Sequence, residues 1–441
     1  MPRLSAHSRP RIGVRREDKN DWERRVPLTP DHVKKLVQQG YDVHVQPSKI
    51  RAFSDREYEA SGATVQEDLS SCNMVFAIKE IPSEFFWKGG RYMFFAHVIK
   101  GQRHNMPMLK RMLELGCTLL DYERVVDDKN RRLIPFGNYA GLAGMIETFY
   151  TLGKRLEWEG MKTPFLALRR PLEYGDLGEA RAALEVVAKW IAAEGLPEKL
   201  SPFVVGFAGY GNVSKGAQEI FDIMPHEDVS PANLDAFMKT GKFSRNKLYK
   251  VVFYEKDMVV PANKNASFDL QGYYQHPEKY RGTFEQYLPH LTSLVNCIYW
   301  DARYPRLVTK KWLRENWNKN SRLKVIGDVS CDIEGSVECT LDATDPGNPI
   351  FTYLPKEDKA IDGFKGDGPV VMAVDTLPSE LPKESSAFFA DMLMPFIPDI
   401  MAMDPSASLD KVTLPPELMK ALIVYKGKLT PEYEYISKHL Q

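Results

Sequence analysis

Residues 11–125 alternate short apolar runs with stretches in which apolar residues recur at helical spacing. The helical stretches are TPDHVKKLVQQG and MPMLKRMLELG, and the apolar runs lie in RIGVRRE, DVHVQP, NMVFAIKE, RYMFFAHV and TLLDYERVV. Strands that alternate regularly with helices are typical of a parallel α/β sheet. Thr29 followed by Pro30 is a cap and first-turn pair, and Gly40 is placed to end that helix.

A second pattern of this kind begins in the middle of the chain. A long apolar helix is expected from Ala140 to about Glu157, and further strands are expected in VVGFAG, KLYKVVFY, LTSLVNCIYW and LKVIGDVS. Near the C-terminus the pattern returns to a capped helix in LPKESSAFFADMLMPF. A chain of 441 residues is too long for one ordinary domain. We therefore expect an α/β fold with two Rossmann-like domains, one made of residues 1–140 plus 380–441 and the other of residues 141–379.

The segment VVGFAGYGNVSKGAQEIF, residues 204–221, has the order strand, glycine turn, helix that pyrophosphate binding requires. Gly209 allows the tight turn, Gly211 lets the backbone approach the phosphates, and Ser214 stands where a third glycine is usual. A small residue at that position still permits close packing of helix on strand. The alternative is a glycine turn between packed elements that binds nothing.

Charge and composition narrow the classes of partner. Lys plus Arg and Asp plus Glu both number 59, which argues against nucleic acid or an anionic membrane as the main partner. No stretch approaches the roughly 20 apolar residues of a membrane span. Five scattered cysteines without a Cys-x-x-Cys pair suit a reducing compartment, here the cytoplasm, and give no metal site. The leader MPRLSAHSRP is rich in Arg and Ser without acids, so the alternatives are a mitochondrial presequence and a frayed terminus.

In the first half of the chain, three apolar runs carry a charged or titratable side chain at or near their end. Lys79 ends NMVFAIK, His97 lies in FFAHVIK, and Glu123 lies in LLDYERVV. Singly, each has an ordinary explanation as a solvated cap or a hydrogen-bonded core residue. Three such groups at successive strand ends favour a cluster in one crevice. The run ERR at 23–25 is either a solvated charge run or an anchor whose guanidinium holds a carboxylate.

Longer motifs carry a family resemblance. RREDKNDWERRVPLTP, FAIKEIP, FFAHVIKGQ, LLDYERVVDDKNRRLIPFGNYAGLAGMI, GYGNVSKGAQEIF, VNCIYWDARYPRLVT and VDTLPSELPKESSAFFADMLMPF together resemble the lysine-2-oxoglutarate reductases of the alanine dehydrogenase and saccharopine dehydrogenase family. The resemblance implies a substrate domain built from both chain ends, a dinucleotide-binding domain between them, and an active site in the cleft. It also implies a reaction in which lysine, 2-oxoglutarate and a reduced nicotinamide give saccharopine by imine formation and hydride transfer.

The same resemblance assigns residues. It implies catalytic roles for Lys79, His97 and Glu123, with the first two as the acid–base pair and Glu123 tuning them. It implies substrate binding by Arg25, Arg132 and Phe136, since saccharopine carries three carboxylates. The cofactor-binding residues that it implies are Gly209, Gly211, Asn212, Val213, Ser214, Ser230 and Asn296.

Cofactor choice depends on the residue at the end of the second strand, HEDVSP. If Ser230 is the terminal residue, no carboxylate faces the ribose and a 2′-phosphate is accepted; if Asp228 faces it, NADH is preferred. The resemblance is greatest to the bifunctional-type reductases, which mainly use NADPH, so we expect NADPH rather than NADH.

Other functions stay open at this point. One alternative is an NAD-dependent saccharopine dehydrogenase working in lysine synthesis, and another is an alanine dehydrogenase-like enzyme that reduces the imine of ammonia. A nucleotide-sensing regulator that keeps the fold without the chemistry is a third. The chain ends at Gln441, about where a bifunctional protein would continue into a glutamate-forming saccharopine dehydrogenase half. We expect either a free-standing reductase or one domain of a longer protein.

Overall fold

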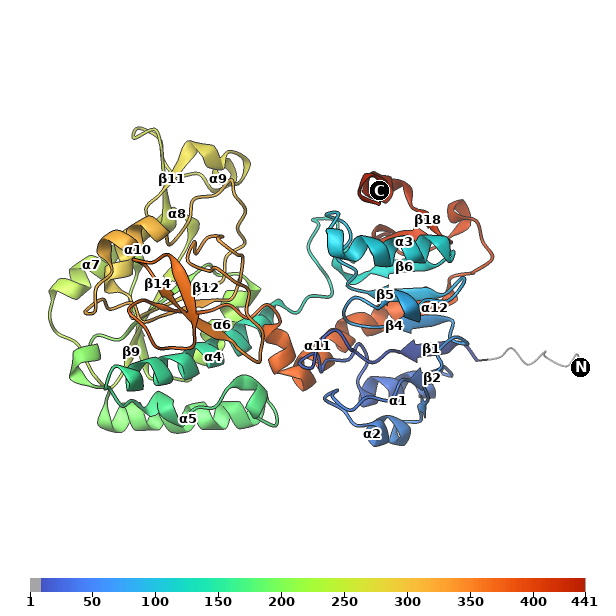
Figure 1. Ribbon diagram of the computed structural model, residues 1–441, viewed down its shortest axis with the longest axis horizontal. Helices are drawn as coiled ribbons and strands as arrows, with labels where there is room; N and C mark the ends of the chain where they lie inside the picture. Colours follow the sequence, from blue (N-terminus) through green and yellow to red (C-terminus); the bar gives the residue numbers. More distant parts are fainter. Residues whose placement is uncertain (1–8, 441) are drawn as a thin grey trace, which may run out of the picture. The chain divides into compact units, whose positions relative to one another are not determined.

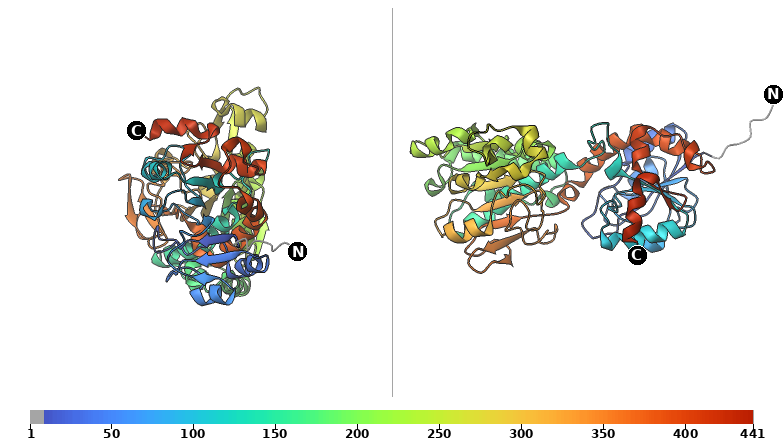
Figure 2. Two further views of the ribbon diagram at one scale, coloured as in Figure 1. Left: turned by 90° about the vertical axis from the view of Figure 1, so that its right-hand side faces the viewer. Right: turned by 90° about the horizontal axis from the view of Figure 1, so that it is seen from above.

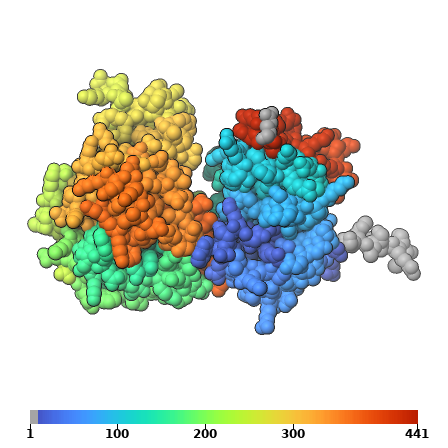
Figure 3. Space-filling model, viewed as in Figure 1, coloured from blue at the N-terminus to red at the C-terminus, as the bar shows by residue number. Residues whose placement is uncertain are grey.

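The computed structural model describes residues 9–440, which form two compact units (Figure 1). The first unit consists of the residues up to Phe136 together with those from Pro382 on, and the second is Gly137–Leu381. In Figure 3 the first unit is blue to cyan and red, and the second is green to orange. The first eight residues of the presequence-like leader lie outside the described part of the chain.

The first unit is built on an eight-stranded sheet in the order β18-β17-β6-β5-β4-β1-β2-β3. The six strands from the N-terminal segment are parallel, because each is followed by a helix or loop that returns the chain to the same edge. β17 runs antiparallel to β6, a pairing that the sequence pattern did not predict. The strands are β1 (Arg11–Val14), β2 (Asp42–Val45), β3 (Thr64–Val65), β4 (Met74–Phe76), β5 (Arg91–Phe94), β6 (Thr118–Asp121), β17 (Leu422–Tyr425) and β18 (Lys428–Leu429).

Helices from both chain segments pack on this sheet. The first helix starts at Pro30 after Thr29, and Gly40 follows it with φ of 96°, a backbone conformation that glycine adopts without strain. Both views of Figure 2 show the red C-terminal segment against the blue and cyan part of the same unit. The helices are α1 (Pro30–Gln38), α2 (Asp55–Ala60), α3 (Met106–Glu114), α11 (Pro382–Leu393), α12 (Ile397–Ala402) and α13 (Pro416–Ala421).

The second unit has its own eight-stranded sheet, in the order β15-β14-β16-β13-β12-β7-β9-β8. Six strands are parallel, and β14 is antiparallel to its neighbours β15 and β16. β8 is second along the chain but lies at the sheet edge, with β9 between it and β7. The strands are β7 (Val204–Ala208), β8 (His226–Asp228), β9 (Leu248–Phe253), β12 (Ser293–Asn296), β13 (Val325–Asp328), β14 (Ile350–Leu354), β15 (Lys359–Asp362) and β16 (Val370–Met372), and a separate hairpin joins β10 (Val259–Pro261) to β11 (Tyr280–Gly282).

Seven α-helices are described in this unit: α4 (Gly137–Trp158), α5 (Leu177–Glu194), α6 (Asn212–Phe221), α7 (Pro231–Lys239), α8 (Glu255–Met258), α9 (Leu270–Gln275) and α10 (Lys310–Asn316). Two mostly parallel sheets with helices confirm the predicted α/β, Rossmann-like fold class. Within residues 9–440, no helix combines the length and the apolar character that crossing a membrane demands.

Two helices of the second unit approach each other very closely. A Cβ added at Gly216 of α6 would lie 2.1 Å from the carbonyl oxygen of Asn138 in α4. Ser214, the residue in the third-glycine position, is fully buried. A Cβ added at Gly141 of α4 would lie 1.9 Å from the carbonyl oxygen of Val213, so glycines on both helices permit this close approach.

Candidate active site

Charged residues collect at the carboxyl edge of the first unit's sheet. β4, β5 and β6 are parallel neighbours, with Phe76 paired to Met93 and Phe94 paired to Asp121. Lys79, His97 and Glu123 follow these three strands within a few residues, so they come from the same edge. The structure thus brings the three predicted catalytic residues to adjacent strand ends.

His97 is held by a carboxylate that the sequence reading did not single out. Its Nδ1 lies 2.7 Å from Oε1 of Glu80, whose Oε2 pairs with Nζ of Lys19 at 2.8 Å. Burial raises the pKa of Glu80, but its bonds to His97 and Lys19 outweigh this and hold the pKa far below the usual range. The backbone of His97 has φ of 48°, and its carbonyl accepts a bond from Asn105 Nδ2 at 3.1 Å. A third of the imidazole side chain remains exposed, so it is not a core histidine.

Two further carboxyls fix the loops that carry these residues. Glu17 accepts the backbone N–H groups of Ile78 (2.6 Å) and Lys79 (3.0 Å). Asp121 accepts those of Ala96 (3.2 Å) and Glu123 (2.8 Å). Burial is the main cause that raises the pKa of both Glu17 and Asp121 to about 7. The loops after β4, β5 and β6 are therefore positioned by carboxyl groups that titrate near neutral pH.

Arg25 is buried rather than solvated, and so is its neighbour Glu23. The Arg25 Nε and Nη2 donate to the two Glu23 carboxylate oxygens at 2.7 and 2.6 Å, which leaves Nη1 outside this pair. Burial would raise the pKa of Glu23, yet the Arg25 guanidinium outweighs it and lowers the pKa. The guanidinium also lies over the Phe136 ring, 4.3 Å from its centroid, and Phe136 stacks on Phe389 of α11 at 4.7 Å.

Arg132 and Glu123 form an ion pair. Half of the Arg132 side chain is exposed, whereas Glu123 is almost buried. Among the described residues, Oε2 of Glu123 is buried without a hydrogen-bond partner. An unpartnered carboxylate oxygen beside an exposed guanidinium is chemically suited to exchange partners with a charged substrate.

The glycine turn of the second unit fits the phosphates of a dinucleotide. Gly209 has φ of 93°, where side chains are strained, and a Cβ on Gly211 would meet nothing within 4 Å. Gly211 caps α6 without a side-chain hydrogen bond, so the first N–H groups of a ten-residue helix remain available for an anion. The residues present therefore match a pyrophosphate-binding turn, with Asn212 as the first residue of the helix.

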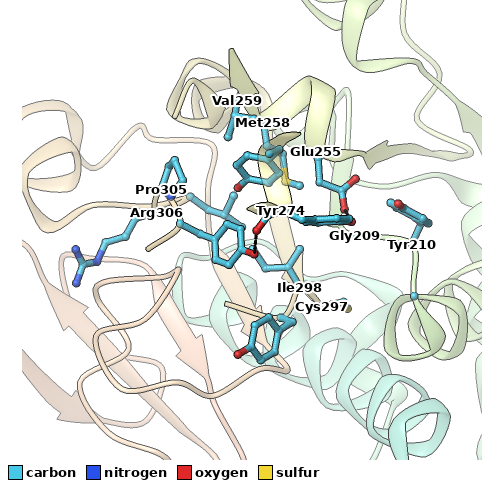
Figure 4. Close-up of a pocket in the computed structure, with 15 residues that line it drawn as sticks. Gly209, Tyr210, Glu255, Met258, Val259, Tyr274, Cys297, Ile298, Pro305 and Arg306 are labelled. Carbon is cyan, nitrogen blue, oxygen red and sulfur yellow. Dashed lines mark hydrogen bonds between the residues drawn. The ribbon is translucent and has the colours of Figure 1, made fainter. Parts of the chain in front are cut away.

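A cavity of about 430 Å³ opens beside this turn. The long segment after β9 supplies part of its wall, and Figure 4 shows the tyrosines that surround it. Its lining residues are Gly209, Tyr210, Gly211, Glu255, Met258, Val259, Tyr273, Tyr274, Cys297, Ile298, Tyr299, Tyr304, Pro305, Arg306 and Leu307.

The other predicted cofactor residues lie elsewhere in the unit. Val213 and Ser214 are in the first turn of α6, and the Ser214 hydroxyl accepts a bond from Gln218 at 2.9 Å. Asn296 ends β12 fully buried, with its amide nitrogen bonded to Asp328, Ser330 and Ser336. Ser230 is the N-cap of α7 after the edge strand β8. None of these four residues lines the cavity.

Two sequence signals were available for residues that the sequence reading missed. Glu80 directly follows Lys79 in FAIKEIP, and Glu255 directly follows the apolar run of β9 in VVFYEK. The sequence suggested only Asp228 in HEDVSP as the acid that could face the ribose, because β8 is the next strand after the glycine strand along the chain. The order of strands in the sheet, which places β9 next to the glycine strand β7, is not visible in the sequence.

The two-unit α/β fold and the glycine turn before a helix are features that pyridine-nucleotide-dependent dehydrogenases share. Residues 13–143 match the alanine dehydrogenase/PNT N-terminal domain. A solved L-alanine dehydrogenase has the same fold, with a TM-score of 0.63, 20% identity, and coverage of 98% of this chain and 100% of that one.

Comparison with curated proteins gives relatives whose names specify an activity. The chain is 40% identical to an alpha-aminoadipic semialdehyde synthase of Arabidopsis thaliana over 97% of its length, but spans only 41% of that protein. It is 28% identical to the saccharopine dehydrogenase [NAD(+), L-lysine-forming] of Emericella nidulans, covering 87% of this chain and 90% of that protein. The predicted resemblance to the alanine dehydrogenase and saccharopine dehydrogenase family is therefore confirmed.

Proposed function

We propose that this chain is a lysine-2-oxoglutarate reductase, which condenses L-lysine with 2-oxoglutarate and reduces the product to saccharopine in lysine catabolism. The observation that carries the proposal is the gathering of Lys79, His97 and Glu123 at neighbouring strand ends of the first unit. The similarity to alpha-aminoadipic semialdehyde synthase over nearly the whole chain supports the choice of substrates. The first unit is proposed to bind the substrates and the second to bind the dinucleotide.

The reaction needs groups that exchange protons near neutral pH. The ε-ammonium of lysine must lose a proton before the amine attacks the ketone, and the resulting carbinolamine must lose water to give the imine. His97 and Lys79 are proposed as the acid–base pair. Glu80 orients the imidazole through Nδ1, so Nε2 is the nitrogen left to exchange protons with the substrate.

Substrate carboxylates are proposed to bind at Arg25 and Arg132. Nη1 of Arg25 lies outside the pair with Glu23, and Phe136 packs under the guanidinium to fix its plane. Arg132 is half exposed and can turn from Glu123 to a substrate carboxylate, which would leave Glu123 to tune the charge near the acid–base pair.

A reduced nicotinamide dinucleotide is the proposed cofactor, with its pyrophosphate on Gly209, Gly211 and the start of α6. When bound, it supplies the hydride that reduces the imine carbon. The expectation of NADPH rested on the resemblance to bifunctional-type reductases and, as a condition, on Ser230 ending the strand next to the glycine strand. In the structure β8, which precedes Ser230, is the edge strand, so the resemblance alone still supports NADPH.

The compartment and partners belong to the proposal as well. The five cysteines are all free within the described residues, which suits the reducing cytoplasm, with the mitochondrial matrix as the alternative. A glutamate-forming saccharopine dehydrogenase, fused or associated, would consume the product. Fractionation of cells that express the tagged full-length protein tests the compartment.

The decisive experiment follows absorbance at 340 nm with lysine, 2-oxoglutarate and either NADH or NADPH, omitting each substrate in turn. Oxidation that requires both substrates supports the proposal. Turnover of pyruvate and ammonia, with none of lysine and 2-oxoglutarate, would replace it with an alanine dehydrogenase-like activity.

A further inference from the structure

The strand next to the glycine strand ends in an acidic residue. β9 pairs with β7 along its length, and the Gly209 N–H donates to the Phe253 carbonyl at 3.1 Å. Tyr254 and Glu255 follow immediately, beyond the end of β9. In sheets of this type, the carboxylate after the strand beside the glycine turn is the group that meets the adenosine ribose. Position in the sheet therefore points to Glu255.

Glu255 faces the cavity beside the glycine turn. It lines this cavity together with Gly209 and Gly211, and its Oε1 accepts a bond from the Tyr274 hydroxyl at 2.6 Å. Figure 4 shows the Glu255 carboxylate directed at the Tyr274 ring end, with Tyr210 on the other side. Tyr274 and Tyr210 both interact with the carboxylate, which has about four acceptor sites and can still accept a hydrogen bond from a ligand.

Asp228 and Ser230, the two residues that the sequence suggested for contact with the ribose, lie farther from the glycine turn in the sheet. Asp228 ends the edge strand β8, its side chain is 74% exposed, and its nearest cation is Lys250 at 4.0 Å. Neither Asp228 nor Ser230 lines the cavity. One strand separates them from the glycine turn, so a ribose bound near that turn would meet Glu255 first.

The charges around the cavity disfavour a phosphate on the ribose. Of the residues that line it, all within the described chain, Arg306 is the one cation. Its guanidinium donates to the carbonyls of Gly335 (3.1 Å) and Glu334 (3.0 Å), and it points away from the tyrosines in Figure 4. Lys256 follows Glu255 but is exposed. A 2′-phosphate beside Glu255 would meet a carboxylate without a cation from the cavity wall to offset it.

We propose that Glu255 determines cofactor specificity by accepting a hydrogen bond from the ribose 2′-hydroxyl, so that this chain binds NADH in preference to NADPH. The inference rests on the dinucleotide part of the proposed function and is independent of which substrates are reduced. It also makes the cavity lined by Tyr273, Tyr274 and Ile298 the adenosine half of the site.

Binding of the two cofactors to the full chain, measured without substrates by isothermal titration calorimetry, tests this proposal. The wild-type protein is expected to bind NADH at least about tenfold more tightly than NADPH. Glu255→Gln should reduce this ratio about tenfold, and Glu255→Arg should reverse it by supplying a cation for the 2′-phosphate. Asp228→Asn and Lys256→Ala are the matched controls and should leave the ratio within about twofold.

Several results would overturn the proposal: a wild-type preference for NADPH, an unchanged ratio in both Glu255 variants, a shift in Asp228→Asn of the size expected for Glu255, or no binding of either dinucleotide. Circular dichroism of each variant shows whether a change in the ratio of NADH to NADPH affinity results from a loss of folded structure. A protein that binds NADH selectively but oxidises none with lysine and 2-oxoglutarate would uphold this inference and refute the proposed substrates, so the two failures are distinguishable.

Discussion

His97 and Lys79 sit among acidic side chains at the sheet edge of the first unit. Glu80 bonds the imidazole of His97, Glu17 bonds the backbone N–H of Lys79, and Asp121 bonds the backbone before His97. At the scale of single residues, the proposed chemistry thus depends on a basic pair whose positions are set by buried and partly buried carboxyls.

Replacing His97 by Gln removes the proposed proton-exchanging nitrogen while keeping a polar side chain of similar length. We expect kcat for lysine and 2-oxoglutarate to fall by roughly 10²- to 10⁴-fold, as for loss of a general acid or base. His104→Gln, at an exposed histidine in the same region, is the control and should keep wild-type kcat. Equal kcat values for His97→Gln and the wild-type protein would exclude a role of His97 as general acid or base.

The pH dependence of stability reports on Asp121. Its folded-state pKa of about 7 lies above the value of an unfolded aspartate, so between pH 4 and 7 the folded state holds a proton that the unfolded state has lost. The contribution of Asp121 to the unfolding free energy therefore falls as pH rises through this window, by at most about 1.4 kcal/mol per pH unit.

Asp121→Asn cannot titrate and should show a flatter dependence than wild type in urea unfolding at pH 5, 6 and 7. Glu17 titrates in the same window in both proteins, so the difference between them isolates Asp121. Parallel curves would show that Asp121 keeps an ordinary pKa in the folded protein.

At the scale of elements, α6 joins two tasks. Its first turn is proposed to bind the cofactor phosphates, and its middle packs against α4 with no room for a side chain at Gly216. Gly211, by contrast, has φ of −72° and open space at its Cβ position. We therefore expect the two glycines to serve different purposes, Gly211 for binding a ligand and Gly216 for packing.

Gly211→Ala and Gly216→Ala should separate these purposes. Gly211→Ala is expected to keep the unfolding free energy within about 0.5 kcal/mol but weaken dinucleotide binding about tenfold or more, because the methyl group occupies the approach to the pyrophosphate. Gly216→Ala should lower the unfolding free energy by about 1–3 kcal/mol, because α4 and α6 must move apart. Urea unfolding and calorimetry measure the two effects, and identical behaviour of the variants would contradict the distinction.

A second element-scale feature anchors α4. Glu147 of α4 and Glu380 are both buried, and Arg170 lies between them, 2.9 Å from Glu147 and 3.6 Å from Glu380. Burial raises the pKa of both carboxyls, against the attraction of Arg170. A single guanidinium thus compensates two buried acids at once.

Arg170→Ala should destabilise the protein by about 3–5 kcal/mol at neutral pH, because it leaves buried carboxyls without their cation. The loss should shrink at pH 5, where both carboxyls are protonated more readily. Arg169→Ala, which removes the exposed neighbouring arginine and its ion pair with Glu179, should cost no more than about 1 kcal/mol. Comparable losses of unfolding free energy in the two variants would mean that the buried cluster contributes no more to stability than an exposed ion pair.

At the scale of the whole molecule, the chain crosses between its units twice. The first unit needs both chain ends, since β17 pairs with β6 and α11 supplies Phe389 against Phe136, whereas the second unit is one continuous segment with its own cores. The two units should therefore differ in their tolerance of truncation.

Ending the chain after Leu381 removes β17, β18 and the helices from α11 on. We expect the truncated chain to lose the buried core of the first unit and all lysine-dependent NADH oxidation, because β6 becomes an unpaired apolar edge. Dinucleotide binding by the second unit should remain within a few-fold of the full chain in calorimetry. Loss of both properties would show that the second unit depends on the first for folding.

Prediction from the sequence succeeded where a local pattern settles the structure. The apolar runs and helical spacings identified β1, β4, β5, β6, β7, α1 and α6, because strand and helix periods are properties of neighbouring residues. The antiparallel partner of β6 and the edge position of β8 were not predicted, because pairing between distant segments leaves no periodic signal. The assignments of individual site residues remain predictions that the experiments above test.

The sequence by itself determined the α/β class, the glycine turn and the family resemblance, because these depend on residue periodicity and on long ordered motifs. Only the tertiary structure decided that Glu23 rather than water faces Arg25, that Glu80 holds His97, and that Glu255 rather than Asp228 stands beside the glycine turn. The physical reason is that burial and charge partners arise from how the strands and loops pack. Packing buries the near neighbours Glu23 and Arg25 together, and it brings Glu255 beside a glycine turn that is distant along the chain.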